Sequence, residues 1–212
     1  MSLAGSIALM SEHTPMKKHH GSITVLVGGM FSGKSELLIH KLRRGVRQKE
    51  RVLAIKPSID NRYSATDLAS HGGHKLGAVT VSCSADIPGM VGDATLVGID
   101  ELQFFDVGIV DVAQDLAAKG VRVILAGLDM DFRGVPFGPV PHMMAVADDV
   151  VKLKAVCVVC GGEATRSQRI VDSHDLVLVG EASAYEARCR GCWGPEPVFA
   201  TSDGNVMGAS DE

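Results

Sequence analysis

The sequence has few aromatic residues, no excess of basic residues and no long apolar run. Aromatic residues make up 4% of the 212 residues, so the core must be built from aliphatic side chains. The net charge of −4 argues against a protein that grips a nucleic-acid backbone, because such proteins carry a basic surface. A membrane helix needs about 20 consecutive apolar residues, and runs such as Val121–Leu128 are far shorter. No basic N-terminal segment indicates a secretory signal, so we expect a cytoplasmic protein that contacts neither nucleic acid nor membrane.

Segments with the patterns of strands and helices alternate over the first 150 residues. Apolar, β-branched runs predict strands, and apolar residues at every third or fourth position predict helices. The predicted strands are 23–27, 52–56, 78–82, 95–100 and 121–128, and the predicted helices are 33–48 and 106–119. Continuous apolar strands between amphipathic helices indicate a mostly parallel α/β sheet with helices on both faces.

A phosphate-binding loop follows the first predicted strand. Its residues match G-x-x-x-x-G-K-[ST], and they are Gly28, Gly29, Met30, Phe31, Ser32, Gly33, Lys34 and Ser35. The glycines let backbone N–H groups converge on phosphate oxygens, and the following helix adds the positive end of its dipole. Lys34 is placed to reach the terminal phosphates of a nucleotide, and Ser35 to bind Mg²⁺. A chance glycine-rich turn is the alternative, which the strand–loop–helix setting disfavours.

Two carboxylates end the predicted strand at 95–100. Asp100 can hold Mg²⁺, partly through water, and Glu101 can accept the proton of an attacking hydroxyl or water. A solvated strand end is the plain alternative for such a pair, but the phosphate-binding loop upstream favours a catalytic role. These residues leave two classes of function open, a small-molecule kinase and a nucleoside triphosphatase that acts as a motor or switch.

Four of the five cysteines form two C-x-x-C pairs, Cys157 with Cys160 and Cys189 with Cys192. Two such pairs supply four thiolates for a closed tetrahedral site, so we expect a structural Zn²⁺. Free thiols or disulfides are the alternative, which the cytoplasm disfavours. The 28 residues between the pairs are expected to protrude as a loop. The fifth, Cys83, is predicted to be a small core residue.

Six segments, in this order, resemble the type II thymidine kinases, the cytosolic, zinc-containing family. They lie between residues 21 and 193, at 29–35, 60–63, 100–105, 127–137, 164–169 and 185–192. Eight of the nine aromatic residues lie in or beside these segments. We therefore expect most of the few rings at a nucleoside pocket and at the cysteine pairs.

The resemblance implies transfer of the γ-phosphoryl group of ATP to the 5′-hydroxyl of thymidine, with deoxyuridine as a weaker substrate, in nucleotide salvage for DNA synthesis. It implies Glu101 as the general base, Asp100 and Ser35 at Mg²⁺, and Arg62 at the phosphates beside the phosphate-binding loop. The loop between the cysteine pairs resembles the family's lasso, which closes over the base. The nucleoside-binding residues implied are Met30, Asp60, Phe104, Leu128, Phe132, Phe137, Ser167, Leu178, Gly180 and Tyr185. The family also implies a homotetramer that thymidine triphosphate inhibits.

The expected architecture is an α/β fold with a RecA-like P-loop sheet and a small zinc-ribbon domain that bears the lasso. The expected parts are a disordered extension over 1–20, a kinase domain over 21–154, a zinc-binding domain over 155–200 and a flexible tail over 201–212. One rival, a P-loop ATPase that works on nucleic acid, would need a basic face. The other, a zinc-stabilised nucleotide-binding regulator without catalysis, would be favoured by loss of Glu101, which is present.

Overall fold

A six-stranded parallel sheet forms the centre of the molecule. The computed structural model of the chain describes residues 20–59, 67–69, 75–171, 182–194, 199–200 and 206–207. All five strand pairings in the sheet are parallel, and the strand order is β5-β2-β6-β7-β1-β8. The strands are β1 (Ser22–Val27), β2 (Val52–Pro57), β5 (Val79–Val81), β6 (Leu96–Ile99), β7 (Arg122–Gly127) and β8 (Asp149–Lys152).

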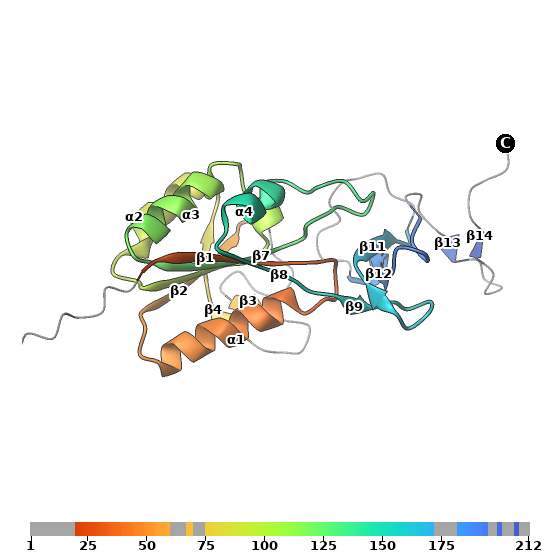
Figure 1. Cartoon of the computed structure of the whole chain (residues 1–212), viewed down its shortest axis with the longest axis horizontal. Helices are drawn as coiled ribbons and strands as arrows, with labels where there is room; N and C mark the ends of the chain where they lie inside the picture. Colours follow the sequence, from red (N-terminus) through yellow and green to blue (C-terminus); the bar gives the residue numbers. More distant parts are fainter. Residues whose placement is uncertain are drawn as a thin grey trace, which may run out of the picture.

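Helices cover both faces of this sheet (Figure 1). One face carries α1 (Lys34–Arg47), and the other carries α2 (Ile87–Val91), α3 (Ile109–Ala118) and α4 (Val140–Val146). Each face has its own buried apolar cluster, and both clusters consist almost entirely of aliphatic side chains. The α/β fold with a mostly parallel sheet, predicted from the alternating pattern, is thus confirmed.

Two glycines let α1 lie close against β6. A Cβ on Gly98 would lie 2.4 Å from Cδ1 of Leu42 in the helix, and a Cβ on Gly45 would lie 2.4 Å from Cδ2 of Leu96 in the strand. Neither position leaves space for a side chain, so the helix axis is held at a short distance from the sheet.

The strand order places two loops at one edge of the sheet. β7 lies between β1, which precedes the phosphate-binding loop, and β6, which precedes the two carboxylates. This is the order expected for a RecA-like sheet. Because all the strands are parallel, the loops that follow β1, β6 and β7 all leave from the same edge, where α/β proteins bind their ligands.

Smaller β elements lie beyond this edge (Figure 1). β9 (Ala155–Val156) pairs with β10 (Glu163–Ala164), and β11 (Arg166–Arg169) pairs with β12 (Tyr185–Arg188), both antiparallel. Cys157, Ala164 and Ala187 form a separate small core between them. The remaining elements are β3 (Asp67–Ala69), β4 (Lys75–Gly77), β13 (Phe199–Ala200), β14 (Val206–Met207) and the 3-10 turns η1 (Ser84–Asp86), η2 (Leu102–Phe104) and η3 (Ala182–Ala184).

The predicted strands and helices are all found, within a few residues at their ends. β8, α2 and α4 were not predicted, because their segments are short and lack a clear period. The prediction for Cys83 was wrong, since its side chain is exposed at the start of η1. Within the described ranges, none of the helices is both long and apolar enough to cross a membrane.

Candidate active site

The phosphate-binding loop is a tight turn between β1 and α1. Gly28 has a φ of 143°, and a Cβ there would lie 2.4 Å from the carbonyl oxygen of Leu153, so no other residue fits. Phe31 and Gly33 also have positive φ values, of 63° and 83°. The Ser32 hydroxyl donates a hydrogen bond of 2.8 Å to the carbonyl oxygen of Gly29, which closes the turn. The loop thus connects the end of β1 to the first residue of α1 in a compact turn.

The first turn of α1 is suited to an anion. No side chain among the described residues caps it at the N-cap, Gly33. The helix dipole makes this end positive, so the backbone N–H groups there suit a bound anion. The Lys34 ammonium bends back over the loop and donates a hydrogen bond of 2.7 Å to the carbonyl oxygen of Gly29. Loop amides, the helix end and Lys34 together present positive charge on one side of the sheet edge.

The two carboxylates at the end of β6 lie next to this positive region. Asp100 is 5% exposed. Burial first, and then the neighbouring Glu101 carboxylate, raise the pKa of Asp100 to about 7, while a hydrogen bond with the Ser35 hydroxyl and the charge of Lys34 oppose that shift. A buried carboxylate that is costly to ionise, with a hydroxyl beside it, fits a site for a hard divalent cation. The donor set formed by Ser35 and Asp100 thus fits Mg²⁺.

Glu101 has the left-handed backbone conformation, with a φ of 52°. A non-glycine residue in this region is uncommon, and such strain is often found at functional sites. The backbone N–H of Glu101 donates a hydrogen bond of 2.9 Å to Oδ1 of Asp100, so the turn depends on the neighbouring carboxylate. The Glu101 side chain is partly exposed.

Gln103 was not predicted from the sequence, yet it holds Glu101. Its amide nitrogen donates a hydrogen bond of 2.5 Å to Oε2 of Glu101. Its amide oxygen accepts a hydrogen bond of 2.9 Å from the N–H of Leu128, the residue that follows β7. The second bond fixes the orientation of the amide, since the oxygen must face Leu128 and the NH₂ group must then face Glu101. The one signal in the sequence was the presence of a glutamine two residues after Glu101. No local pattern indicated its bond to Leu128, 25 residues away.

Aromatic side chains from two loops gather near the same edge. The rings of Phe104, after β6, and Phe137, after β7, meet edge to face with their centroids 5.9 Å apart. Both rings are half-buried, as is Leu128. Phe105 is instead buried in the core cluster on the α3 face. The rings of Phe104 and Phe137 thus meet at this edge and are not part of the buried core clusters.

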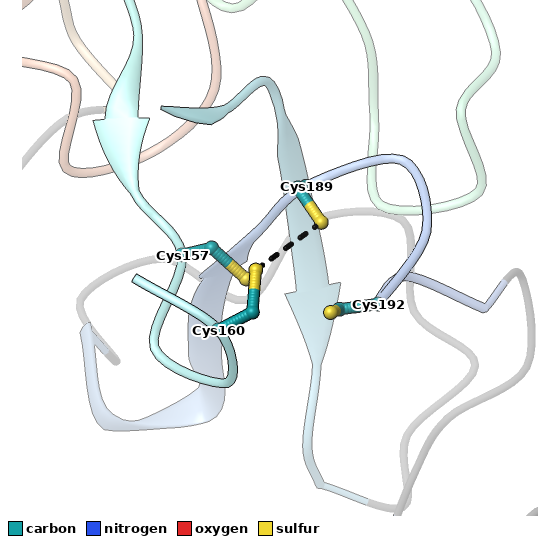
Figure 2. Close-up of side chains that lie close together, drawn as sticks. All are labelled: Cys157, Cys160, Cys189 and Cys192. Carbon is teal, nitrogen blue, oxygen red and sulfur yellow. Dashed lines mark hydrogen bonds between the residues drawn. The ribbon is translucent and has the colours of Figure 1, made fainter. Parts of the chain in front are cut away.

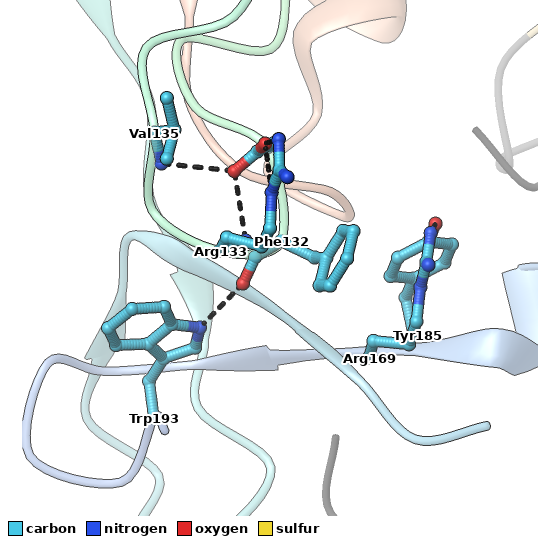
Figure 3. Close-up of polar contacts among 7 residues, drawn as sticks. Phe132, Arg133, Val135, Arg169, Tyr185 and Trp193 are labelled. Carbon is cyan, nitrogen blue, oxygen red and sulfur yellow. Dashed lines mark hydrogen bonds and ion pairs between the residues drawn. The ribbon is translucent and has the colours of Figure 1, made fainter. Parts of the chain in front are cut away.

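The Arg169 guanidinium lies close to the rings of both Phe132 and Tyr185 (Figure 3). The guanidinium carbon of Arg169 is 3.7 Å from the centroid of the Phe132 ring and 5.1 Å from that of Tyr185. Its Nη2 also donates a hydrogen bond to the hydroxyl of Tyr185. Arg169 is fully buried. The structure therefore brings two predicted pocket residues together through an arginine that was not predicted.

Ser167 ties the cysteine-bearing segment to the phosphate-binding loop. Its hydroxyl accepts a hydrogen bond of 2.9 Å from the N–H of Met30. A Cβ on Gly29 would lie 3.4 Å from the same hydroxyl oxygen, an ordinary contact distance, so β11 packs directly against the loop. Four predicted site residues lie outside the described residues, namely Asp60, Arg62, Leu178 and Gly180.

The four paired cysteines converge on one point (Figure 2). Their sulfur atoms all lie within 4.8 Å of one another. The sulfurs of Cys160 and Cys189 are 3.7 Å apart, close to the separation of about 3.8 Å that Zn–S bonds of about 2.3 Å give in a tetrahedron. The cluster therefore fits a structural Zn²⁺, as predicted.

Hydrogen bonds within the cluster separate the acidities of the thiols. The backbone of Cys189 is the main cause that lowers the pKa of Cys157 to about 6. The side chain of Cys189 is the main cause that raises the pKa of Cys192 to about 12. The Cys157 thiol thus loses its proton easily, whereas the Cys192 thiol would stay protonated unless a cation balanced the negative charge of the cluster. A divalent metal supplies that charge.

Comparisons with known proteins agree with this geometry. A family model described as "Thymidine kinase" matches residues 21–193. A curated thymidine kinase from Bacteroides thetaiotaomicron is 45% identical over 187 residues, which cover 88% of this chain and 94% of that protein.

Proposed function

Because the chain belongs to the thymidine kinase family, we propose that it transfers the γ-phosphoryl group of ATP to the 5′-hydroxyl of thymidine, and less readily to that of deoxyuridine. One observation carries this proposal. The phosphate-binding loop, the Asp100–Glu101 pair and the Phe104–Phe137 rings all lie on loops at one edge of the sheet. That edge combines an anion site, a base and an apolar surface, which are the three requirements of a nucleoside kinase.

The phosphates of ATP are assigned to the loop of residues 28–35. Its backbone amides and the start of α1 would hold phosphate oxygens, and Lys34 would exchange its bond to the Gly29 carbonyl for the terminal phosphates. Ser35 and Asp100 are the proposed residues at Mg²⁺. When bound, the ion neutralises charge on the transferred phosphoryl group. Arg62 is proposed to add a further positive charge there.

Glu101 is the proposed general base. Its carboxylate is held by the amide of Gln103, and it follows β6 at the sheet edge from which the phosphate-binding loop also leaves. A carboxylate in this place can accept the proton of the 5′-hydroxyl as that oxygen attacks phosphorus. Asp60 is proposed to contact the sugar.

The thymine ring is assigned to the apolar surface beside Glu101. A flat, weakly polar base is best held between aromatic and aliphatic side chains. The walls proposed from the described residues are Met30, Phe104, Leu128, Phe132, Phe137, Ser167 and Tyr185. Leu178 and Gly180, in the lasso, are proposed to close over the base and exclude water, which would otherwise hydrolyse ATP.

Three further properties are implied by the family resemblance. We propose a homotetramer, feedback inhibition by thymidine triphosphate and action in the cytoplasm. Free thiols that cluster as metal ligands suit a reducing compartment. We also propose that residues 21–154 and 155–200 form the kinase and zinc-binding domains; the expected extension over 1–20 and tail over 201–212 lie almost entirely outside the described residues.

A panel of nucleosides with ATP tests the function directly. Purified protein is incubated with Mg²⁺, ATP and thymidine, deoxyuridine, deoxycytidine or deoxyadenosine, and nucleoside monophosphate is measured. Formation of thymidine monophosphate, with less deoxyuridine monophosphate, is expected. ATP hydrolysis that proceeds without any nucleoside, and without monophosphate formation, would instead favour the motor or switch class.

A further inference from the structure

The loop between β7 and α4, which carries Phe132, is internally braced. Met130 and Pro136 form an isolated antiparallel bridge across it. The Asp131 carboxylate accepts hydrogen bonds from the N–H groups of Arg133 and Val135, at 2.9 and 3.0 Å (Figure 3). These hydrogen bonds and the bridge fix the shape of the loop itself. Contacts with other segments then help to set its position on the protein.

Trp193 makes one such contact. Its indole N–H donates a hydrogen bond of 3.2 Å to the carbonyl oxygen of Phe132 (Figure 3). The same indole lies against Gly134, where a Cβ would be 3.0 Å from Cη2 of the tryptophan. Gly134 also has a φ of 77°, which disfavours any other residue. Trp193 thus holds the loop at the residue whose ring is assigned to the thymine pocket.

The position of Trp193 depends in turn on the cysteine cluster. Trp193 follows Cys192 directly. The N–H of Trp193 and the N–H of Cys192 both donate hydrogen bonds to the carbonyl oxygen of Cys189, at 3.0 and 3.2 Å respectively. The carbonyl oxygen of Cys192 accepts a hydrogen bond of 3.3 Å from Nη1 of Arg188. The backbone turn that orients the indole is therefore the turn that presents two of the four sulfur ligands.

A second link joins the same two regions. The guanidinium of Arg166, in β11, lies 5.6 Å from the centre of the Trp193 ring. Nη1 of Arg166 is 2.8 Å from the sulfur of Met130, at the base of the braced loop. Trp193 and the loop are thus joined at Phe132, at Gly134 and, through Arg166, at Met130.

We propose that Trp193 is a positioning residue that couples metal in the four-cysteine cluster to Phe132, so that metal occupancy sets the affinity for the nucleoside. The inference rests on the proposed function, because it takes Phe132 as a wall of the thymine pocket. Without a cation, no metal–sulfur bonds hold the two cysteine turns together, although their sulfur atoms lie within 4.8 Å of one another, and the turn before Trp193 loses that support. The Phe132 carbonyl then loses its donor and the ring loses its fixed place. By linkage, bound thymidine should raise the affinity for the metal by the same factor by which bound metal raises the affinity for thymidine.

Two variants with the metal bound test the coupling. Trp193→Phe keeps a ring and removes the N–H donor, and Trp193→Ala removes both. Thymidine affinity is measured by calorimetry on samples with equal zinc content. Loss of one hydrogen bond should weaken binding of thymidine by Trp193→Phe about 3- to 10-fold, and Trp193→Ala should bind more weakly still. The control is Val159→Ala, in the other cysteine turn, where the side chain is 59% exposed. It should bind thymidine as the wild type does.

Metal removal supplies the second measurement. Trp193 is the only tryptophan of the chain, so its fluorescence reports on this contact directly. Chelation of zinc in the wild type should shift the emission and weaken thymidine binding, and in Trp193→Ala it should no longer change the affinity. If the metal-free protein unfolds by circular dichroism, the comparison of the zinc-loaded variants decides the matter.

The inference is overturned if zinc-loaded Trp193→Phe and Trp193→Ala bind thymidine as tightly as Val159→Ala. It is also overturned if folded, metal-free wild type keeps its full thymidine affinity. Failure of the proposed function looks different, because then the wild type itself would bind no thymidine.

Discussion

Replacement of Gln103 by methionine tests how the proposed base is held. Methionine has nearly the same length and fills the same buried space, where Gln103 is 3% exposed, but it makes neither hydrogen bond. The N–H of Leu128 loses the acceptor that Gln103 provides, and the Glu101 carboxylate loses the hydrogen bond from the Gln103 amide. The two losses act on different quantities, since the first affects the folded state and the second affects the reaction.

The size of each effect follows from the type of bond. A buried N–H without a partner costs about 1–3 kcal/mol, which lowers the melting temperature by about 3–10 °C in a chain of this size. A hydrogen bond to a charged carboxylate is worth about 1.5–3 kcal/mol. If that bond holds Glu101 in the transition state, kcat should fall about 10- to 100-fold, with little change in the KM values for ATP and thymidine.

Steady-state kinetics and thermal unfolding measure the two effects, and Gln168 provides a matched control. Gln168 is also buried, at 1% exposure, and its amide oxygen accepts a hydrogen bond of 2.9 Å from the N–H of Gly194. Gln168→Met should therefore lower the melting temperature to a similar extent while kcat changes little. If Gln103→Met and Gln168→Met lose stability to the same extent and both keep the wild-type kcat, Gln103 is only structural and the reasoning fails.

Three other variants test the remaining elements. Glu101→Gln should keep ATP affinity and lose phosphorylation by several orders of magnitude, and near-normal turnover would remove Glu101 from the role of base. Cys189→Ser should release zinc and lower the melting temperature, whereas an unchanged zinc content by atomic absorption would contradict the four-cysteine site. Hydrogen bonds from the hydroxyl and N–H of Ser84 lower the pKa of Asp106. Asp106 therefore stabilises the folded protein at neutral pH. This stabilisation is lost as the pH falls below the ordinary pKa of an aspartate and then through the lowered pKa of Asp106. Asp106→Asn should reduce the difference in melting temperature between pH 7 and pH 3, and an unchanged difference would show that this carboxylate contributes nothing.

Much of the fold was predictable because its signals are local. Strand and helix periods depend only on neighbouring residues, so the core strands and α1 and α3 were found in place. The shorter β8, α2 and α4 escaped because a segment of four to seven residues holds too little of a period. Cys83 was misplaced because a small apolar residue after a strand-like run reads as core, while the backbone turns there into η1.

The candidate site divides in the same way. The residues with reactive or ligating groups stand in short motifs, because a phosphate-binding loop, a pair of adjacent carboxylates and a C-x-x-C turn are each formed by residues close in the chain. The amino-acid order alone was therefore enough to predict that the cysteine pairs suit zinc and that residues 28–35 suit phosphate.

What holds those groups in place came only from the tertiary structure. Gln103 bonds to a residue 25 positions away, Trp193 to one 61 away, and Ser167 to one 137 away. The same is true of the few aromatic residues, since the chain order could not show that Phe104 meets Phe137 while Phe132 stacks on Arg169. Partners so distant in the chain are set by how the sheet edge and the cysteine segment pack together. No local pattern encodes that packing, because it depends on the shapes of both surfaces at once.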